Sequence, residues 1–211
     1  MEALEQIKSR LETAIAGAKV EIVPNDSPSG QRSLLLDHPH AKAAALFLRE
    51  DPELCLDYCS NATGVDWPDK ELSEKVKVKT LVDGQEKELE EVRKTLRPGC
   101  LEAVYHLYSI ARKHGPVIIR LRTVDRHEQA HLPSLTPVWR SCEFQEREIY
   151  DLYGVVFDGH PDLRRILMWE GYKDFPMRKD YVEPDDYEYE PTPHDEVLLK
   201  TRSHAAAEVK T

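Results

Sequence analysis

Long apolar segments are missing from this chain of 211 residues. It holds no run of about eighteen uncharged apolar residues, which a transmembrane helix would need. It also does not begin with basic residues followed by an apolar stretch, as a secretory signal does. We therefore expect neither direct insertion into a membrane nor export.

An excess of positive charge is missing too, since the formal net charge is -10 at pH 7. Binding to nucleic acid needs a concentrated positive surface, so we expect no nucleic-acid partner. The acidic residues are unevenly placed, and residues 180–211 hold nine acidic and three basic side chains. This part of the chain is interrupted by proline and has little apolar surface to bury, so residues 181–211 are predicted to form an extended acidic tail.

Cysteines are few and scattered, and a chain without a secretory signal that spaces them this way is typical of a reducing compartment. Cys55 and Cys59 could supply half of a metal site, but no second close pair or nearby histidine completes it. We expect both to be small buried residues. A glycine-rich nucleotide or flavin loop and a set of cysteines spaced for an iron–sulfur cluster are also missing.

One catalytic pattern is present, because residues 127–131 read H-E-x-x-H. On a helix, His127 and His131 would share one face and bind zinc, with Glu128 as the base. Here the pattern follows a predicted strand and stops at Pro133, whose ring disfavours helical geometry just before it. We predict a connecting loop and keep a zinc hydrolase as a minor alternative.

The spacing of apolar residues predicts an α/β (α+β) fold with a mixed, largely antiparallel sheet packed with helices. Residues 1–180 are expected to form one domain, with a charged insertion near residues 70–98. Residues 61–64 are predicted to turn the chain, Asp83–Gly84 to close a hairpin, and residues 86–96 could form an exposed helix. Helices are predicted at 3–18, from about 41 to 49 and at 140–153, and strands at 20–23, 33–37, 54–58, 75–81, 100–111 and 117–124, the last two as an antiparallel pair.

Residues 139–181 combine aromatic, charged and turn-forming side chains, a mixture that suits a surface for other proteins. In the predicted helix the apolar side chains are expected to face the core. Its charged residues are expected outside or at an edge, paired four residues apart as Glu143–Arg147 and Arg147–Asp151. The inward set is Cys142, Ile149, Leu152 and Tyr153, and the outward set is Glu143, Glu146, Arg147, Glu148 and Asp151.

Beyond this helix, Gly154 is expected to end it and Pro161 to begin a short second helix. In that second helix the apolar Leu163, Ile166 and Leu167 are expected to face inward, while Arg164 and Arg165 project. Adjacent arginines can make planar contacts with carboxylates of a partner. No cleft or nucleophile accompanies the acidic residues, so we expect no catalytic site here.

At this point a family resemblance becomes specific. The sequence resembles the 30 kDa subunit of NADH:quinone oxidoreductase, respiratory complex I, in five places: Glu146-Arg147-Glu148, Asp151-Leu152-Tyr153-Gly154, Phe157, His160-Pro161-Asp162-Leu163-Arg164-Arg165-Ile166-Leu167 and Pro176-Met177-Arg178-Lys179-Asp180. Weaker similarity covers Asp66-Trp67-Pro68 and Tyr105-His106-Leu107-Tyr108. Cys142 and Met177 depart from the usual alanine and leucine, and residues 70–98 are harder to align.

The resemblance implies a non-catalytic scaffold and assembly subunit in the hydrophilic arm of a proton-translocating enzyme. That enzyme passes electrons from NADH through FMN and iron–sulfur clusters to a quinone such as ubiquinone, and these cofactors would lie on partner subunits. The neighbours would be the quinone-site and terminal iron–sulfur subunits, at the cytoplasmic face of the bacterial inner membrane. The equivalent subunit of a membrane-bound hydrogenase or another complex-I-like dehydrogenase is the alternative.

On this interpretation the chain has no catalytic, cofactor-binding or metal-binding residues of its own. The acidic tail is expected to bind a neighbouring subunit. The residues expected to make contacts between subunits are Glu146, Arg147, Asp151, His160, Arg164, Arg165, Arg178 and Lys179.

Overall fold

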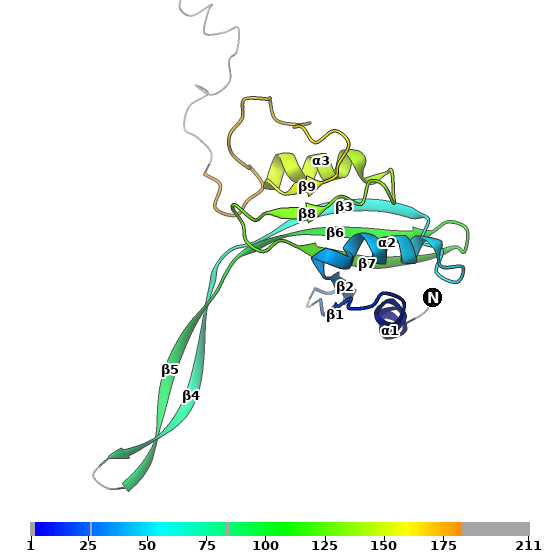
Figure 1. Ribbon diagram of the computed structural model, residues 1–211. Coiled ribbons are helices and arrows are strands. Elements are labelled where there is room, and N and C mark those ends of the chain that lie inside the picture. Colours follow the sequence, from blue (N-terminus) through cyan, green and yellow to red (C-terminus); the bar gives the residue numbers. More distant parts are fainter. Residues whose placement is uncertain (1–2, 26, 83–84, 183–211) are drawn as a thin grey trace, which may run out of the picture. The chain divides into compact units, whose positions relative to one another are not determined.

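The computed structural model describes residues 3–25, 27–82 and 85–182, and it describes residues 72 and 74–93 by their backbone alone (Figure 1). The chain separates into two units, Met1–Tyr181 and Val182–Thr211, and the helices and strands within the described residues all belong to the first. The predicted Asp83–Gly84 turn and nearly all of the predicted acidic tail lie outside the described residues.

A five-stranded mixed sheet forms the centre of the first unit and confirms the predicted fold class. Strands β2 and β7 run parallel, and the other neighbours are antiparallel. The order across the sheet is β1 (Val20–Val23), β2 (Ser33–Leu36), β7 (His114–Arg122), β6 (Cys100–Ser109) and β3 (Tyr58–Trp67).

Strands β6 and β7 pair antiparallel, as predicted, and their alternating sequences separate two faces. One face is apolar and fully buried, with Tyr105 of β6 opposite Ile119 of β7. The other face places Glu102 opposite Arg122. The sheet thus has an apolar face for the core and a second face with charged side chains.

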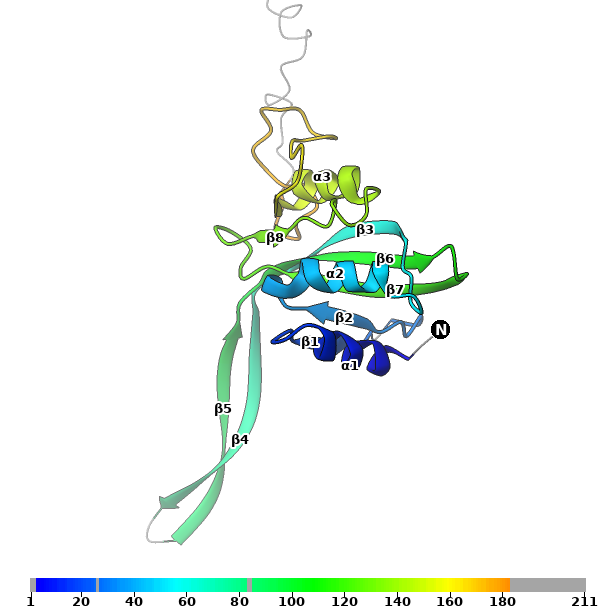
Figure 2. The ribbon, with the colours of Figure 1, turned by 45° about the vertical axis from the view of Figure 1, so that its right-hand side comes forward.

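Helices α1 (Leu4–Ala14) and α2 (Ala41–Glu50), the latter preceded by the short 3-10 helix η1 (His38–His40), lie on the apolar side of the sheet (Figures 1 and 2). Their apolar residues recur at helical spacing, and Ile7, Leu11 and Leu48 are fully buried. The predicted helices at these places are confirmed, although α1 ends four residues earlier than expected. None of the helices within the described residues has the length and apolar character that crossing a membrane requires.

Helix α3 (Cys142–Tyr153) packs along β3, and it confirms the helix predicted at 140–153. The Ser141 hydroxyl donates to the Cys59 carbonyl over 2.8 Å, and the Gln145 side chain accepts the Ala62 N–H. These bonds satisfy backbone groups on the outer edge of β3, which would otherwise be open to another chain. Gly154 ends the helix at a φ of 78°, a left-handed conformation that glycine adopts without strain.

The charged insertion forms a hairpin of β4 (Lys70–Val82) and β5 (Gln85–Arg97). Its register runs from Lys70 opposite Arg97 to Val82 opposite Gln85, directly continuing the pairing of Trp67 with Cys100. The strand predicted at 75–81 is confirmed. The exposed helix suggested for 86–96 is wrong, because pairing with β4 supplies backbone hydrogen bonds that outweigh helix propensity.

Two further local predictions are wrong. Residues 54–57 precede β3 as turn and coil rather than forming a strand, and residues 61–64 lie inside β3 rather than in a turn. Pairing with β6 from Tyr58 to Trp67 overrides the turn-forming tendency of Asn61 and Gly64. The expected burial holds for Cys59, whereas Cys55 is partly exposed.

Gly64 has a packing role, because a Cβ built there would lie 2.4 Å from the Tyr153 ring. Gly64→Ala is therefore expected to push α3 away from β3 and lower the free energy of unfolding by about 1–3 kcal/mol. Gly171→Ala is the control, since a Cβ there meets its nearest atom at an ordinary 3.6 Å. Urea unfolding followed by circular dichroism measures both, and equal stability of the two variants would contradict the close packing.

Candidate functional site

The segment from Gly159 to Tyr181 follows β9 (Val156–Asp158), which pairs in parallel with β8 (His131–Pro133). It contains turns and bends but no helix or strand, and it passes beside α3 (Figure 1). The short helix predicted after Pro161 is therefore wrong. We call residues 159–181 the surface segment, and its geometry depends on side chains that sequence spacing assigned to the solvent.

Asp151 is fully buried, which corrects the prediction that it lies outside α3. Its Oδ2 accepts the N–H groups of Ile166, Leu167 and Met168 over 3.0, 2.7 and 2.9 Å. Its Oδ1 accepts from Nη1 of Arg165 over 2.6 Å. Burial alone raises the pKa of Asp151, but these hydrogen bonds lower it further, so that the pKa lies below its ordinary value.

The same interaction explains why the apolar side chains of residues 166 and 167 face outward. Since Asp151 binds their backbone amides, the backbone turns inward, and the Leu167 side chain is 59% exposed. Ile166 is also exposed, so the inward placement of both residues was wrong. Arg164 projects as predicted, whereas the side chain of Arg165 is only 12% exposed because it pairs with Asp151.

Arg147 is buried and donates through Nε to the Arg164 carbonyl over 3.2 Å and through Nη2 to the Arg165 carbonyl over 3.3 Å. Its Nη1 lies 3.6 Å from a carboxylate oxygen of Asp162. The predicted pairs of Arg147 with Glu143 and Asp151 are therefore replaced by contacts with the surface segment. Helical spacing reveals only partners on the same helix, so it could not show these.

Glu146 is likewise buried rather than outside, and its carboxylate accepts four hydrogen bonds from the rest of the fold. The donors are the Tyr105 hydroxyl at 3.1 Å, the Ser134 hydroxyl at 2.6 Å, the Leu135 N–H at 2.8 Å and the Thr136 hydroxyl at 3.1 Å. Burial raises the pKa of Glu146, and the four donors offset part of this rise. Glu146 thus ties α3 to β6 and to the loop after β8.

The end of the surface segment is fixed by Asp66 and Arg126, which sequence patterns did not mark as site residues. Both are buried, and two guanidinium nitrogens of Arg126 each donate over 2.7 Å to Asp66. Arg126 also donates to Asp180 over 2.8 Å, and Asp66 accepts the Lys179 N–H over 2.8 Å. Arg126 holds the pKa of Asp180 below its ordinary value. Asp66 lies in a matched motif, but nothing in the sequence indicates Arg126.

The three remaining predicted contact residues also bond within the chain. His160 Nε2 lies 2.9 Å from the Glu143 carbonyl, and Arg178 donates through Nε to the Tyr153 carbonyl over 2.7 Å. The Lys179 ammonium lies 5.5 Å from the centre of the Trp67 ring. A Cβ at Gly154 would come within 2.8 Å of Arg178, so this glycine also permits the close approach of the segment.

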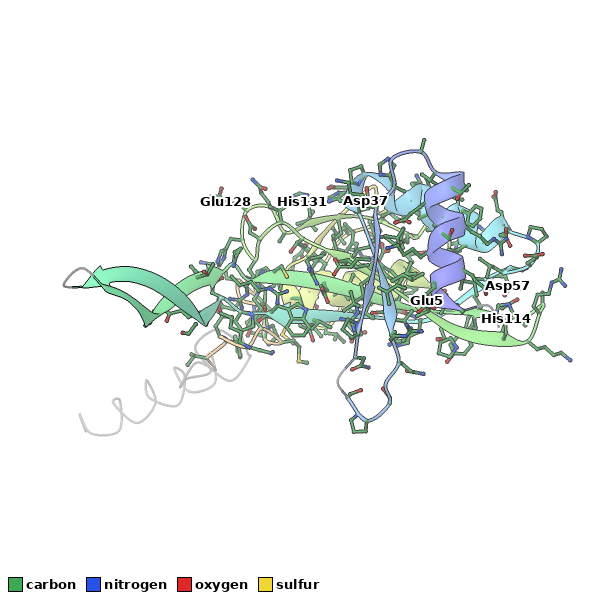
Figure 3. All side chains as sticks on the ribbon, turned by 90° about the horizontal axis from the view of Figure 1, so that it is seen from below. Glu5, Asp37, Asp57, His114, Glu128 and His131 are labelled. Atoms are coloured by element: carbon green, nitrogen blue, oxygen red, sulfur yellow. The ribbon has the colours of Figure 1, made fainter. Side chains whose placement is uncertain are left out.

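The H-E-x-x-H residues occupy a turn and then β8, which confirms the predicted connecting loop (Figure 3). His131 Nδ1 lies 3.0 Å from a carboxylate oxygen of Asp158. The helical geometry that a zinc hydrolase needs is therefore not formed by His127, Glu128 and His131. Within the part of the chain that the structure describes, no three His, Cys, Asp or Glu side chains are placed to hold a metal ion together.

Asp151→Asn is expected to lower the free energy of unfolding at pH 7 by about 1–3 kcal/mol, because the charged acceptor of three amides and Arg165 is lost. The folded-state pKa is below the unfolded value of about 3.9, so the stabilisation by the charge is present above that pH. It is lost as the pH falls through the lower, folded-state pKa.

Urea unfolding at pH 7, 5 and 3 measures this difference. The gap between wild type and Asp151→Asn should be constant from pH 7 to 5 and narrower at pH 3. Asp162→Asn, at an exposed carboxylate, should change stability far less. A gap that widens on acidification would contradict the assignment.

The chain has clear sequence relatives. A family model described as respiratory-chain NADH dehydrogenase, 30 Kd subunit, matches residues 34–187. A protein of Rhizobium meliloti, named as one subunit of NADH-quinone oxidoreductase, is 40% identical over 136 residues, which cover 64% of this chain and 57% of that relative. The subunit of the same name from Streptomyces coelicolor is 34% identical over 152 residues, covering 72% and 49%. The chain thus spans about half the length of these curated relatives.

A similar fold occurs in a solved structure of the membrane-bound sulfane sulfur reductase (MBS), an archaeal respiratory membrane complex. The TM-score is 0.55 and the identity 18%, with 86% of each chain covered, so this likeness concerns the fold alone. Membership of the family rests on the sequence, because the family model matches well over half of the residues. The chain belongs to the family of the respiratory-chain NADH dehydrogenase 30 kDa subunit.

Proposed function

We propose that this chain is a non-catalytic scaffold and assembly subunit in the hydrophilic arm of a proton-translocating NADH:quinone oxidoreductase. Family membership supports the proposal, and so do relatives named as one subunit of such an enzyme. FMN, iron–sulfur clusters and quinone would be bound by neighbouring chains. The work of this chain would be to position those neighbours.

The observation that carries an assembly role is the form of the surface segment. Its backbone is fixed from within by Asp151, Arg147 and the Asp66–Arg126 pair, so little conformational entropy would be lost when a partner binds. Its outward side chains are apolar and basic, a combination typical of protein interfaces. The exposed side chains are Arg164, Ile166, Leu167 and Met177.

This arrangement divides the predicted contact residues into two groups. Arg164 and Lys179 offer charge at or near the surface for a partner, and we propose direct contacts for them. Glu146, Asp151 and Arg165 are bonded inside the chain, so we propose that they act on the partner through the shape of the surface segment. Arg147, His160 and Arg178 would act in the same way.

The partners that we propose are the subunits that hold the quinone site and the terminal iron–sulfur cluster. The location would be peripheral, at the cytoplasmic face of the bacterial inner membrane. The acidic tail, residues 181–211, would bind one of these neighbours. A membrane-bound hydrogenase or another complex-I-like dehydrogenase is the alternative host, and the relatives named NADH-quinone oxidoreductase favour the first assignment.

Arg164→Glu combined with Leu167→Asp should reduce co-purification with the arm subunits by more than about tenfold, because both side chains are exposed and a buried charge at an interface is unfavourable. Affinity purification from native membranes, with identification of the bound chains and NADH:quinone reductase activity, measures this. Arg165 is left unchanged because its pairing with Asp151 makes it part of the fold.

Lys42→Glu is the matched control, an exposed charge reversal on α2. It should leave assembly unchanged. Normal assembly of the double variant would contradict docking through the surface segment. A nickel-containing enzyme among the bound chains would move the proposal to the hydrogenase alternative.

A further inference from the structure

A groove of about 360 Å³ lies where β1, β2 and β7 end, away from the surface segment. Leu35 and Val124 contribute apolar walls, and Arg122 and Glu21 contribute opposite charges. Its other carboxylates already have partners: Glu12 accepts the Val20 N–H over 3.3 Å, and Asp37 accepts the Lys19 N–H over 3.0 Å. The groove therefore presents an apolar centre between a positive and a negative group.

Arg122 belongs to an ion cluster on the charged face of the sheet. The carboxylate of Glu102 is fully buried and accepts from Arg120 over 3.0 Å and from Arg122 over 2.8 Å. Arg120 also donates to the Ser33 hydroxyl over 2.7 Å. One carboxylate thus serves two guanidinium groups, and the cluster has a net positive charge.

Arg122 has capacity to bind a further acceptor. Its Nε and Nη2 face Glu102, and its side chain is 32% exposed. Among the residues that the structure describes, no contact engages its Nη1. A guanidinium held on one side by a buried carboxylate is oriented before binding, which favours recognition of a second carboxylate.

Val124 adds an exposed apolar side chain beside the same guanidinium. It follows β7 by two residues, lines the groove and is 68% exposed. A single exposed valine is ordinary on a protein surface, but this one borders a hollow that an apolar side chain of a partner could fill. An apolar pocket next to an oriented arginine is the usual composition of an energetically important contact.

We infer that this groove is a second docking site, which seats a segment of a neighbouring subunit of the complex. The segment carries an apolar side chain that fills the groove, a carboxylate that pairs with Arg122 and a basic residue on the side of Glu21. The inference rests on the proposed function, since it requires the chain to be part of an assembly. It assigns the chain an additional contact surface formed by β1, β2 and β7.

Val124→Asp tests this site without touching the core. It should lower co-purification with the arm subunits by about tenfold or more, because a carboxylate would enter the apolar groove next to the carboxylate of the partner. Ile110→Asp is the matched control, since Ile110 is 63% exposed and lies at the opposite end of the β6–β7 pair. Ile110→Asp should assemble normally, and the melting temperatures of both variants should match the wild type.

Arg122→Gln is the second variant, because Arg120 still neutralises Glu102 and the fold should be kept. It should weaken assembly several-fold and reduce the sensitivity of assembly to salt. Normal assembly of Val124→Asp and Arg122→Gln would overturn the inference. A concentration-dependent dimer of the purified chain that Val124→Asp abolishes would overturn it too, since a second copy would then be the occupant.

The wild-type chain separates this inference from the proposed function. If the wild type binds no arm subunit, the proposed function fails. If the wild type assembles and Val124→Asp assembles equally well, only the second docking site fails.

Discussion

The carboxylate of Asp151 is the interaction on which the candidate site depends. Three consecutive backbone N–H groups and one guanidinium converge on it, although the segment that donates them has no regular secondary structure. A buried carboxylate is unfavourable without such partners, so its desolvation and the order of the segment are coupled. Removing the charge would release the backbone and with it the position of the exposed side chains.

Other buried charges extend the same principle along the chain. Arg147 binds the carbonyl groups next to those amides, and the Asp66–Arg126 pair fixes the segment near Asp180. Glu146 holds α3 against the loop after β8, so the helix that carries Asp151 is itself fixed. Fully bonded polar networks of this kind specify one geometry more than they add stability. A surface held in one geometry suits a subunit whose work is to position others.

Much of the fold could be predicted from local patterns. The strand at residues 20–23 and the antiparallel pair of β6 and β7 follow from alternation, and α3 and its end at Gly154 follow from helical spacing and glycine conformation. The strand nature of residues 61–64 and 86–96 could not be predicted, because each depends on a partner strand distant in the sequence. Pairing across the sheet decided both against local propensity.

The candidate site was predicted by place but not by orientation. Residues 139–181 were identified as the important stretch, yet Glu146, Arg147 and Asp151 face inward rather than outward. A charged residue on a helix is expected at the surface unless something compensates for its burial. Here the compensation comes from Ser134, from Arg165 and from backbone amides near residue 167, none of which lies on the helix.

The most direct test of this account is native-state hydrogen exchange of the wild-type chain, resolved by residue. The amides of Ile166, Leu167 and Met168 lie outside any helix or strand, so their exchange depends on the carboxylate of Asp151. The account predicts that all three are protected to a degree similar to amides of α3. Exchange at the rate of an open loop would contradict it.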